Sequence, residues 1–317
     1  MKIVYLGSGE FGIDCLDAIA ASNHNLDFIV TQPSQPAGRG RRPKPTAVAD
    51  WAERHKIAFT ETDDVNSPGV FDKIAVRRPE LIVVIAFGQK IGTGLVNLPA
   101  KGAINVHSSL LPKYRGAAPI NRAIINGEKQ TGVSIITLAE KMDAGDILAQ
   151  TKTDILQNET AGELHNRLAK LAAPLLLETI DKIAAGAVVY TKQDDSEATS
   201  APKLKKSDGF LDFAESAEAL KRRILGFWPW PGASAIYVSK KTGKTHRVTI
   251  AMVSVVQSAN PNHLPPGTLD ENINVICGKD ALKILKIKPA DGNLMEFGDF
   301  ANGRATQAGD MFTKINE

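Results

Sequence analysis

Short apolar runs alternate with segments of helical pattern along the N-terminal third of this 317-residue chain. Each run has the length of a buried strand and is bounded by turn-forming or polar residues. The runs are KIVYLG (2–7), LDFIVT (26–31), LIVVIAF (81–87) and GAINVH (102–107), and helix-like segments lie around 10–22, 46–55, 66–76 and 90–97. Strands that are joined through helices lie parallel to one another. The alternation therefore predicts an α/β fold with an open, mostly parallel sheet of Rossmann-like topology.

The pattern changes in the second half of the chain. A long amphipathic stretch at 160–186 predicts one helix, which Pro174 kinks because its ring removes a backbone hydrogen bond. After a helix-like piece at 215–227, short apolar runs separated by Gly, Pro and Asn predict a smaller antiparallel β-barrel, of a kind that often binds nucleic acid. The polar residues 191–209, before this barrel, lack apolar periodicity, which predicts a linker. We therefore expect an α/β domain at 1–190, a linker at 191–209 and an OB-like barrel domain at 210–317.

Cysteine usage and hydropathy argue against several classes of protein. The two cysteines, Cys15 and Cys277, are far apart and in no metal-ligand spacing, so we expect reduced core residues and no metal site. No stretch approaches the roughly 18 to 20 consecutive apolar residues of a membrane span. The N-terminal MKIVYLG lacks the long apolar region and cleavage site of a signal peptide. We expect a cytoplasmic monomer with no membrane partner.

A glycine motif follows the first predicted strand. Gly7, Gly9 and Gly12 fit G-x-G-x-x-G, a loop that can hold a pyrophosphate on its backbone N–H groups. The pattern also requires an acidic residue about 20 residues later, at the end of the second strand. That strand ends instead at Thr31 and Gln32. We therefore interpret the glycines as a tight turn, and keep a dinucleotide-dependent oxidoreductase or sugar-nucleotide enzyme as a second hypothesis.

Three segments of the chain are basic and contain no acidic residue. They span residues 28–49, 198–207 and 219–269. Because the formal net charge of the whole chain is only +3, the positive charge is segregated rather than abundant. Segregated cations neutralise phosphates and release counterions, so we expect a nucleic acid or another polyanion as a partner. A solvated charged surface is the alternative for any one segment.

The stretch TQPSQPAGRGRRPKPTAVADWA (31–52) carries the first basic segment. Its prolines and glycines argue against regular structure and predict a long projecting loop. The cations of this loop are Arg39, Arg41, Arg42 and Lys44. They are the first candidates for contact with the polyanion.

The stretch INVHSSLLPKYRGAAPINR (104–122) places two polar side chains at the tip of an apolar strand. In a strand, Asn105 and His107 point to the same side, and ligands of open parallel sheets bind beyond the carboxyl ends of the strands. An amide donor and an imidazole can together polarise a carbonyl and stabilise an oxyanion. The alternative is that Asn105 satisfies backbone groups and His107 is structural.

A carboxylate partner for His107 is available in AEKMDAGDIL (139–148), between two strand-like runs. Asp143 precedes the flexible pair Ala144-Gly145. From there it can hold His107 as an imidazolium and take up a proton through water. The alternative is a hairpin turn in which Asp143 caps its own backbone.

These stretches resemble the motif set of a known family. INVHSSLLPKYRGAAPINRAIINGEKQTGVSI together with MDAGDIL resembles the signature of the 10-formyltetrahydrofolate-dependent formyltransferases, which is Asn-x-His, then SLLP-x-x-RG-x-AP, then Asp-x-Gly. The resemblance runs over nearly the whole chain and is strongest at 1–150 and 200–235. The loop TQPSQPAGRGRRPKP is similar to an inserted loop with which some members read tRNA, and GFWPWPGA is similar to the entry to their C-terminal domain.

The resemblance implies an activity. The enzyme would transfer the formyl group of 10-formyltetrahydrofolate to the α-amine of methionyl-initiator tRNA, for translation initiation. Asn105 and protonated His107 would stabilise the tetrahedral oxyanion, and Asp143 would orient His107 and help to remove the proton of the attacking amine. This chemistry requires no metal. Within the family, the alternative is an amino-sugar formyltransferase, which would not need the basic loop.

The resemblance also implies a folate site beside these residues. The flat pterin needs an apolar slot edged with backbone hydrogen bonds. We assign its walls to Ser109, Leu110, Leu111 and Pro112 and to Phe87 and Gly88, with Arg115 as a local anchor.

For tRNA, the resemblance implies contacts from both parts of the chain. Arg39, Arg41 and Arg42 would approach the acceptor end, and Lys205, Lys206 and the basic segments of the second domain would follow the backbone. We expect Trp228 and Trp230 to pack at the domain junction rather than to stack on bases. A non-catalytic RNA-binding protein, in which His107 has no role in turnover, is a further hypothesis.

Overall fold

The computed structural model describes residues 1–37, 42–258 and 263–316, and it divides the chain into two compact units. The first unit consists of Met1–Pro119, Gln130–Asp154 and His165–Ala201, and the second of Ile120–Lys129, Ile155–Leu164 and Pro202–Glu317. Two short segments before residue 165 therefore fold with the C-terminal part of the chain. The domain boundaries that we expect at 190 and 210 stay a prediction.

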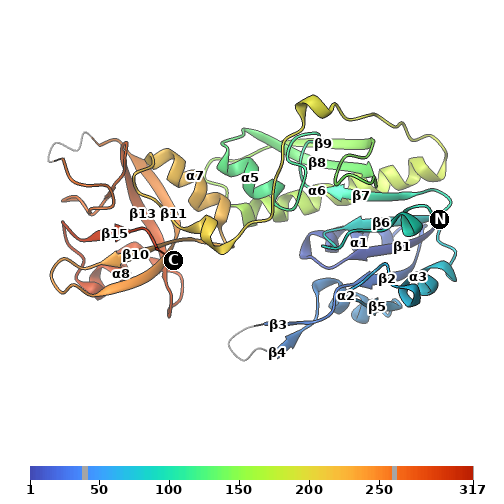
Figure 1. Ribbon diagram of the computed structural model, residues 1–317, viewed down its shortest axis with the longest axis horizontal. Helices are drawn as coiled ribbons and strands as arrows, with labels where there is room; N and C mark the ends of the chain where they lie inside the picture. The colour runs from blue at the N-terminus through green and yellow to red at the C-terminus, as the bar shows by residue number, and fades with distance from the viewer. Residues whose placement is uncertain (38–41, 259–262, 317) are drawn as a thin grey trace. The chain divides into compact units, whose positions relative to one another are not determined.

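A seven-stranded sheet in the order β5-β2-β1-β6-β7-β8-β9 forms the centre of the first unit (Figure 1). Its strands are β1 (Lys2–Gly7), β2 (Asn25–Thr31), β5 (Phe59–Glu61), β6 (Leu81–Ile85), β7 (Ala103–His107), β8 (Gln130–Thr137) and β9 (Ile147–Asp154). The strands from β5 to β7 pair in parallel, whereas β8 and β9 add antiparallel ladders at one edge. The prediction of an open, mostly parallel sheet is confirmed.

The central strands β1, β6 and β7 are almost entirely buried, whereas the edge strands β5 and β9 are partly exposed. Helices connect the strands. They are η1 (Glu10–Gly12), α1 (Ile13–Ala20), α2 (Ala47–His55), α3 (Pro68–Ala75), α4 (Thr93–Val96), α6 (Ala161–Ala184, which contains Pro174) and η2 (Asp195–Glu197). On β1, Val4 belongs to one buried cluster with Ile74 of α3, and the next residue, Tyr5, is fully buried although it points to the opposite face. Strands that are buried on both faces read as continuous apolar runs, which makes them recognisable in the sequence.

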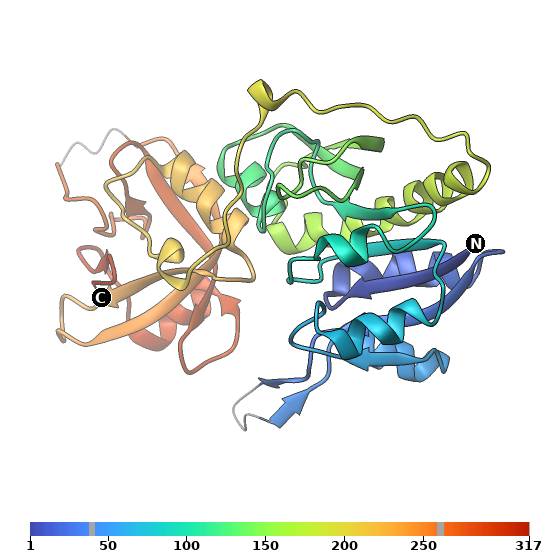
Figure 2. The ribbon, with the colours of Figure 1, turned by 45° about the vertical axis from the view of Figure 1, so that its right-hand side comes forward.

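The stretch 31–52 differs in part from its prediction. It contains β3 (Gln35–Ala37) and β4 (Arg42–Lys44), which pair antiparallel, so the expectation that the prolines exclude regular structure is wrong. Pro36 lies opposite Pro43, and a two-stranded ribbon tolerates both because one side of each strand has no ladder partner. The ribbon projects from the seven-stranded sheet, as the sequence predicts (Figures 1 and 2).

The second unit is built on a nearly closed antiparallel sheet in the order β12-β13-β11-β10-β15, with β14 paired to β13. Its elements are α5 (Pro119–Ile125), η3 (Lys206–Gly209), α7 (Ala217–Phe227), β10 (Ala233–Val238), β11 (Thr245–Val256), β12 (Val275–Ile276), β13 (Ala281–Pro289), β14 (Met295–Glu296), α8 (Phe297–Arg304) and β15 (Met311–Thr313). Leu220 of α7 packs into one core with Tyr237, Phe300 and Phe312. The predicted smaller barrel is confirmed. None of the described helices is long and apolar enough to cross a membrane.

Candidate active site

The strand β7 carries two polar side chains to the carboxyl end of the sheet. It pairs with β6 on one side and with β8 on the other, so its own backbone is fixed along both edges. Ile104 and Val106 are buried in the apolar interior, and the intervening Asn105 and His107 face the loop beyond the sheet. His107 is only 6% exposed, and Asn105 is half-buried.

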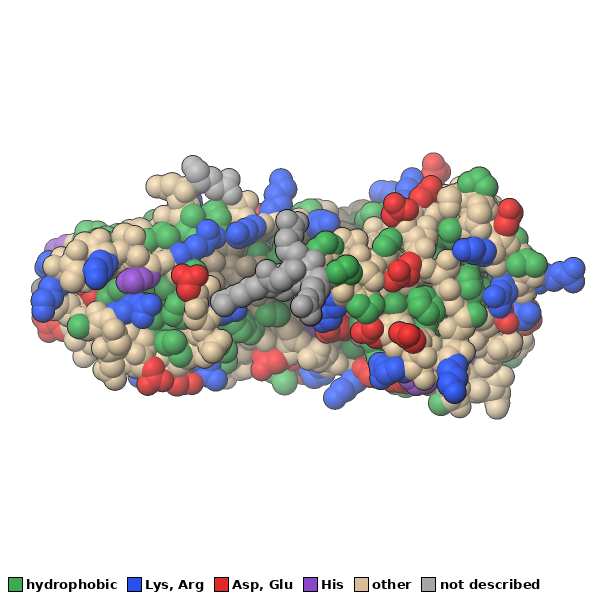
Figure 3. Space-filling model, turned by 90° about the horizontal axis from the view of Figure 1, so that it is seen from below, with side chains coloured by type: hydrophobic (Ala, Val, Ile, Leu, Met, Phe, Trp, Pro, Cys, Tyr) green, Lys and Arg blue, Asp and Glu red, His purple; other side chains and the backbone are tan. Residues whose placement is uncertain are grey.

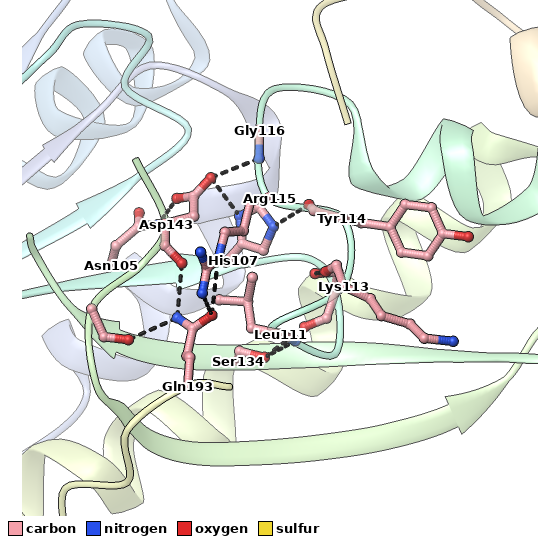
Figure 4. Close-up of polar contacts among 12 residues, drawn as sticks. Asn105, His107, Leu111, Lys113, Tyr114, Arg115, Gly116, Ser134, Asp143 and Gln193 are labelled. Carbon is pink, nitrogen blue, oxygen red and sulfur yellow. Dashed lines mark hydrogen bonds and ion pairs between the residues drawn. The ribbon is translucent and has the colours of Figure 1, made fainter. Parts of the chain in front are cut away.

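Asp143 meets both of these side chains from the loop between β8 and β9 (Figure 4). Asn105 Nδ2 donates to Asp143 Oδ1 over 3.4 Å, and His107 Nδ1 lies 3.6 Å from Asp143 Oδ2. The backbone N–H of Gly116 also donates to Oδ2, at 2.8 Å. The structure therefore brings together the three residues that the sequence singles out.

The second ring nitrogen of His107 also faces an oxygen. Nε2 donates to the backbone carbonyl of Tyr114 over 2.9 Å, because a carbonyl can only accept. With that proton on Nε2, a proton on Nδ1 is needed for the ring to donate toward Asp143 as well. The ring of His107 thus lies between two oxygen atoms, with a hydrogen bond from Nε2 to the Tyr114 carbonyl and a carboxylate oxygen 3.6 Å from Nδ1.

The backbone of the Asp143 loop is tightly constrained. Asp143 itself has φ +54°, in the left-handed region. A Cβ on Gly145 would collide with the carbonyl of Thr137, so the loop can fold back onto β8 only with glycine there. Asp146 continues the turn through a backbone N–H that donates to Thr137 Oγ1 over 2.9 Å. The Asp-x-Gly spacing in the sequence therefore has a steric cause.

The residues proposed for a folate wall follow the carboxyl ends of β6 and β7. Ser109 and Leu111 are buried, and their segment is fixed by the Ser109 hydroxyl donating to Lys113 O over 2.7 Å and by the Leu111 N–H donating to Ser134 Oγ over 3.1 Å. Leu110 and Pro112 are half-buried and present partly free surfaces. The segment after β7 therefore offers a rigid, mostly apolar edge.

The segment after β6 presents its backbone rather than an aromatic ring. Phe87 is 2% exposed because its ring packs in the core cluster, while Gly88 is exposed with φ +79°. The side chain of Gln32 donates to the carbonyl of Phe87 over 2.7 Å and fixes this turn.

The structure describes only some of the candidate tRNA-contacting residues. Arg39 and Arg41 lie outside the described residues, and only the backbone of Arg42, in β4, is described. Lys205 and Lys206 are exposed in the second unit. On the face drawn in Figure 3, Lys and Arg side chains are exposed among Asp and Glu side chains.

The glycine motif has a packing explanation. A Cβ on Gly12 would collide with the hydroxyl of Tyr5, and one on Gly7 would lie 2.6 Å from the Tyr5 ring and from the carbonyl of Ile85. At the end of β2, Thr31 Oγ1 hydrogen-bonds to Thr46 Oγ1 over 2.7 Å. Gly7 and Gly12 therefore make room for a buried tyrosine, and a Cβ on Gly9 would lie 3.2 Å from Cβ of Ala86, in agreement with the interpretation of the motif as a tight turn.

Sequence reasoning misses how much of the site comes from residues after α6. Arg115, which is 8% exposed, pairs with Asp195 Oδ1 over 2.7 Å, and its guanidinium also donates to Gln193. The hydrogen bond from Arg115 holds the pKa of the Asp195 carboxyl below its usual value. The segment 191–201 has no apolar pattern, so nothing in its sequence signals that it packs here.

Both the N-terminal and the C-terminal part of the chain match known protein families. The family described as "Formyl transferase" matches residues 1–180, and "Formyl transferase, C-terminal domain" matches residues 203–305. A relative from Citrifermentans bemidjiense named methionyl-tRNA formyltransferase is 38% identical and covers 99% of this chain and 97% of its own. A relative of the same name from Methylococcus capsulatus is 36% identical, over 96% of this chain and 97% of its own.

Solved structures share the fold at much lower identity. WlaRD, a sugar 3N-formyl transferase solved in the presence of dTDP and 5-N-formyl-THF, has a TM-score of 0.64 at 15% identity, over 92% of this chain and 99% of its own. HypX from Aquifex aeolicus, solved in complex with tetrahydrofolic acid, has a TM-score of 0.60 at 16% identity, over 100% of this chain and 51% of its own. With the two family matches and the full-length relatives, these likenesses lead to one conclusion: the chain belongs to the formyl transferase family.

Proposed function

We propose that this enzyme transfers the formyl group of 10-formyltetrahydrofolate to the α-amine of methionyl-initiator tRNA, which yields N-formylmethionyl-tRNA for translation initiation. The observation that carries the proposal is similarity through both units to relatives named methionyl-tRNA formyltransferase, at 38% and 36% identity. The sugar N-formyltransferase reading has weaker support, because WlaRD shares only 15% of its residues with this chain.

The geometry of the site supports a reaction through a tetrahedral oxyanion. The free amine attacks the formyl carbon, and the carbonyl oxygen gains negative charge. Asn105 Nδ2 has a second proton beyond the one directed at Asp143, and it can donate that proton to the oxyanion. His107 Nδ1 lies 3.6 Å from the carboxylate, too far for a full hydrogen bond, so its proton is also available.

Asp143 completes this scheme as the proton acceptor. Its carboxylate lies beside both donors and is only 12% exposed. As the amine attacks, Asp143 takes up the proton that the nitrogen loses, directly or through one water. When the bond between the formyl carbon and N10 breaks, Asp143 returns that proton to N10, so that the folate leaves as an amine. Until it takes up that proton, the negative carboxylate also stabilises the positive ring of His107.

We assign the two substrates to different surfaces. The folate would lie against residues 87–88 and 109–112, which follow the carboxyl ends of β6 and β7. The tRNA would contact the β3–β4 ribbon through Arg39, Arg41 and Arg42, and the second unit through Lys205 and Lys206. We place the enzyme in the cytoplasm, where its free thiols, Cys15 and Cys277, would stay reduced.

A formyl-transfer assay with purified protein tests this function. The acceptors would be methionyl-initiator tRNA, methionyl-elongator tRNA and a dTDP-linked amino sugar, each with 10-formyltetrahydrofolate. We expect rapid formylation of the initiator tRNA, slower formylation of the elongator and none of the sugar. Preferential formylation of the sugar would show that the enzyme belongs with the sugar N-formyltransferases instead.

A further inference from the structure

The segment of residues 191–201, called the strap below, is hydrogen-bonded at both ends to loops of the candidate active site. At its start, Thr191 exchanges two backbone hydrogen bonds with Ile147, of 2.8 and 2.9 Å, where β9 begins. At its end, Arg115 N–H donates to Thr199 O over 2.8 Å, and Ala201 N–H donates to Arg115 O over 2.7 Å. The strap therefore spans from the Asp143 loop to the loop after β7.

Between these ends, Gln193 joins the two loops through its side chain (Figure 4). Its Nε2 donates to the backbone carbonyls of Asp143 and Gly145, over 2.8 and 2.7 Å. Its Oε1 accepts from Nε and Nη2 of Arg115, over 3.0 and 2.8 Å. Two donated and two accepted hydrogen bonds use the whole capacity of a side-chain amide, so Gln193 is fully committed to these contacts.

The strap also reaches the other partner of His107. Tyr114 presents its carbonyl to Nε2 of that ring, and the N–H of the same Tyr114 donates to Thr199 Oγ1 over 2.9 Å. Tyr114 and Asp143 both have positive φ angles, +64° and +54°. Non-glycine residues hold this strained conformation only where their surroundings fix it, and here the strap contacts both.

We propose that Gln193 is a positioning residue for the reaction, which sets the orientation of Asp143 toward Asn105 and His107 and ties it to the loop after β7. The proposal rests on the proposed function, since it assigns Asp143 a role in the chemistry. Gln193 does not touch the reacting atoms. It acts by fixing the backbone on both sides of the Asp143–Gly145 turn, where a small displacement would change both donor distances of the cluster.

The chemistry of the contacts indicates which substitution is informative. In Gln193→Glu, the carboxylate still accepts from Arg115 and keeps that half of the contacts. It has no N–H for the carbonyls of Asp143 and Gly145 and instead places negative charge against them. Gln193→Glu therefore removes the link to the Asp143 loop while the strap stays attached to Arg115.

We would compare Gln193→Glu and Gln193→Ala with wild type, and use Glu197→Gln as the matched control. Glu197 is exposed on the same strap, and its exchange is the same acid–amide change in reverse. We expect both Gln193 variants to lose about tenfold to a hundredfold in kcat, with KM for folate and tRNA within about twofold, because misplaced catalytic groups lower the rate of the chemical step. Thermal midpoints should stay near that of wild type. Normal kcat, or losses that follow a lowered thermal midpoint, would overturn the proposal.

A second measurement does not depend on activity. We would follow backbone hydrogen exchange in peptides that cover residues 139–148 and the N–H of Gly116, which donates to Asp143. Faster exchange there in Gln193→Glu but not in Glu197→Gln supports the positioning role, and unchanged exchange refutes it. If wild type transfers no formyl group, the proposed function fails, and the exchange result still decides whether Gln193 holds the loop.

Discussion

His107 is held between two oxygen atoms, and each of these belongs to a residue with a left-handed backbone. The carbonyl of Tyr114 accepts from Nε2, and the carboxylate of Asp143 faces Nδ1. Each left-handed residue costs roughly 1 to 2 kcal/mol relative to an ordinary conformation. In return, the orientation of the ring is fixed before substrate arrives, which is what electrostatic stabilisation of an oxyanion requires.

The two cysteines allow a prediction at the residue scale. Both are free and buried, and burial raises the pKa of Cys15 and of Cys277 to about 12. At pH 8 hardly any thiolate is present, so we expect neither thiol to react with a disulfide reagent in the native protein. After denaturation, both thiols should react with the reagent before the first time point of the assay. Prompt labelling of one thiol in the native protein would show that its environment is more open than described.

Sequence reasoning singles out the cluster to which we assign the chemistry, but not the residues that support it. Strand alternation and a glycine-containing turn make Asn105, His107 and Asp143 candidates at one sheet edge, and the resemblance to the formyltransferase motifs singles them out. Gln193 is not recognisable, because an isolated polar residue in a polar segment carries no periodic signal. Its contacts arise only when residues 50 positions apart meet, with Asp143 as the partner.

At the scale of elements, the turn between β1 and α1 tests the packing explanation of the glycine motif. Gly12 has φ −87°, which alanine adopts readily, so the main obstacle to a Cβ there is the collision with the Tyr5 hydroxyl, with Tyr5 Cζ a tight contact at 3.1 Å. We expect Gly12→Ala to lower the free energy of unfolding by about 1 to 3 kcal/mol.

Adding Tyr5→Phe to that variant removes the hydroxyl and should recover most of the loss, as measured by denaturant unfolding. If Gly12→Ala leaves stability unchanged but abolishes turnover, the glycines contact a ligand after all.

The start of α6 gives a prediction for pH dependence. Thr160 donates its N–H and its hydroxyl to Glu163 Oε2, over 2.9 and 2.7 Å, and these bonds hold the pKa of that carboxyl below its ordinary value of 4.5. A pKa that is lower in the folded state stabilises the fold above the unfolded-state value, and this contribution is lost as pH falls through the folded-state value.

Glu163→Ala should therefore cost about 1 kcal/mol at neutral pH, as loss of a helix cap does. The difference from wild type should shrink as pH falls below 4.5, in thermal unfolding measured over a pH series. A difference that is the same in acid as at neutral pH would mean that packing, not the cap, is responsible.

The elements themselves are predictable in proportion to their burial. β1, β2, β6 and β7 follow from the sequence because they are continuous apolar runs. β5 is missed because it has only three residues, FTE, and β3 and β4 are missed because prolines mask them. Such short ribbons depend on pairing rather than on local propensity.

At the scale of the whole molecule, the basic residues are assigned a role in tRNA binding that is separate from folate binding. We expect Arg42→Ala, and Lys205→Ala with Lys206→Ala, to weaken tRNA binding and to lower the salt dependence of log K by roughly 0.7 to 0.9 for each phosphate that is no longer neutralised. The KM for the folate should stay within about twofold, since that substrate is assigned to the ends of β6 and β7. If these variants weakened the binding of tRNA and of folate equally, the assignment of the two substrates to separate surfaces would be wrong.

The fold class of each unit follows from sequence periodicity, whereas the assignment of segments to units does not. Residues 120–129 and 155–164 interrupt the first unit and fold with the second. Nothing in their composition distinguishes them from their neighbours, because membership in a unit depends on long-range contacts.

The most direct test of the central claim is a single-turnover formyl transfer from 10-formyltetrahydrofolate to methionyl-initiator tRNA by wild type, Asp143→Asn and Asp154→Asn. Asp143→Asn keeps the size of the side chain but removes its charge, and Asp154 is a control at the far end of β9, where it accepts from Gln130. We predict that Asp143→Asn lowers the rate constant by about 10²- to 10³-fold, while the rate constant of Asp154→Asn and the thermal midpoints of both variants remain near wild type. A rate constant for Asp143→Asn within a few-fold of wild type would contradict the account.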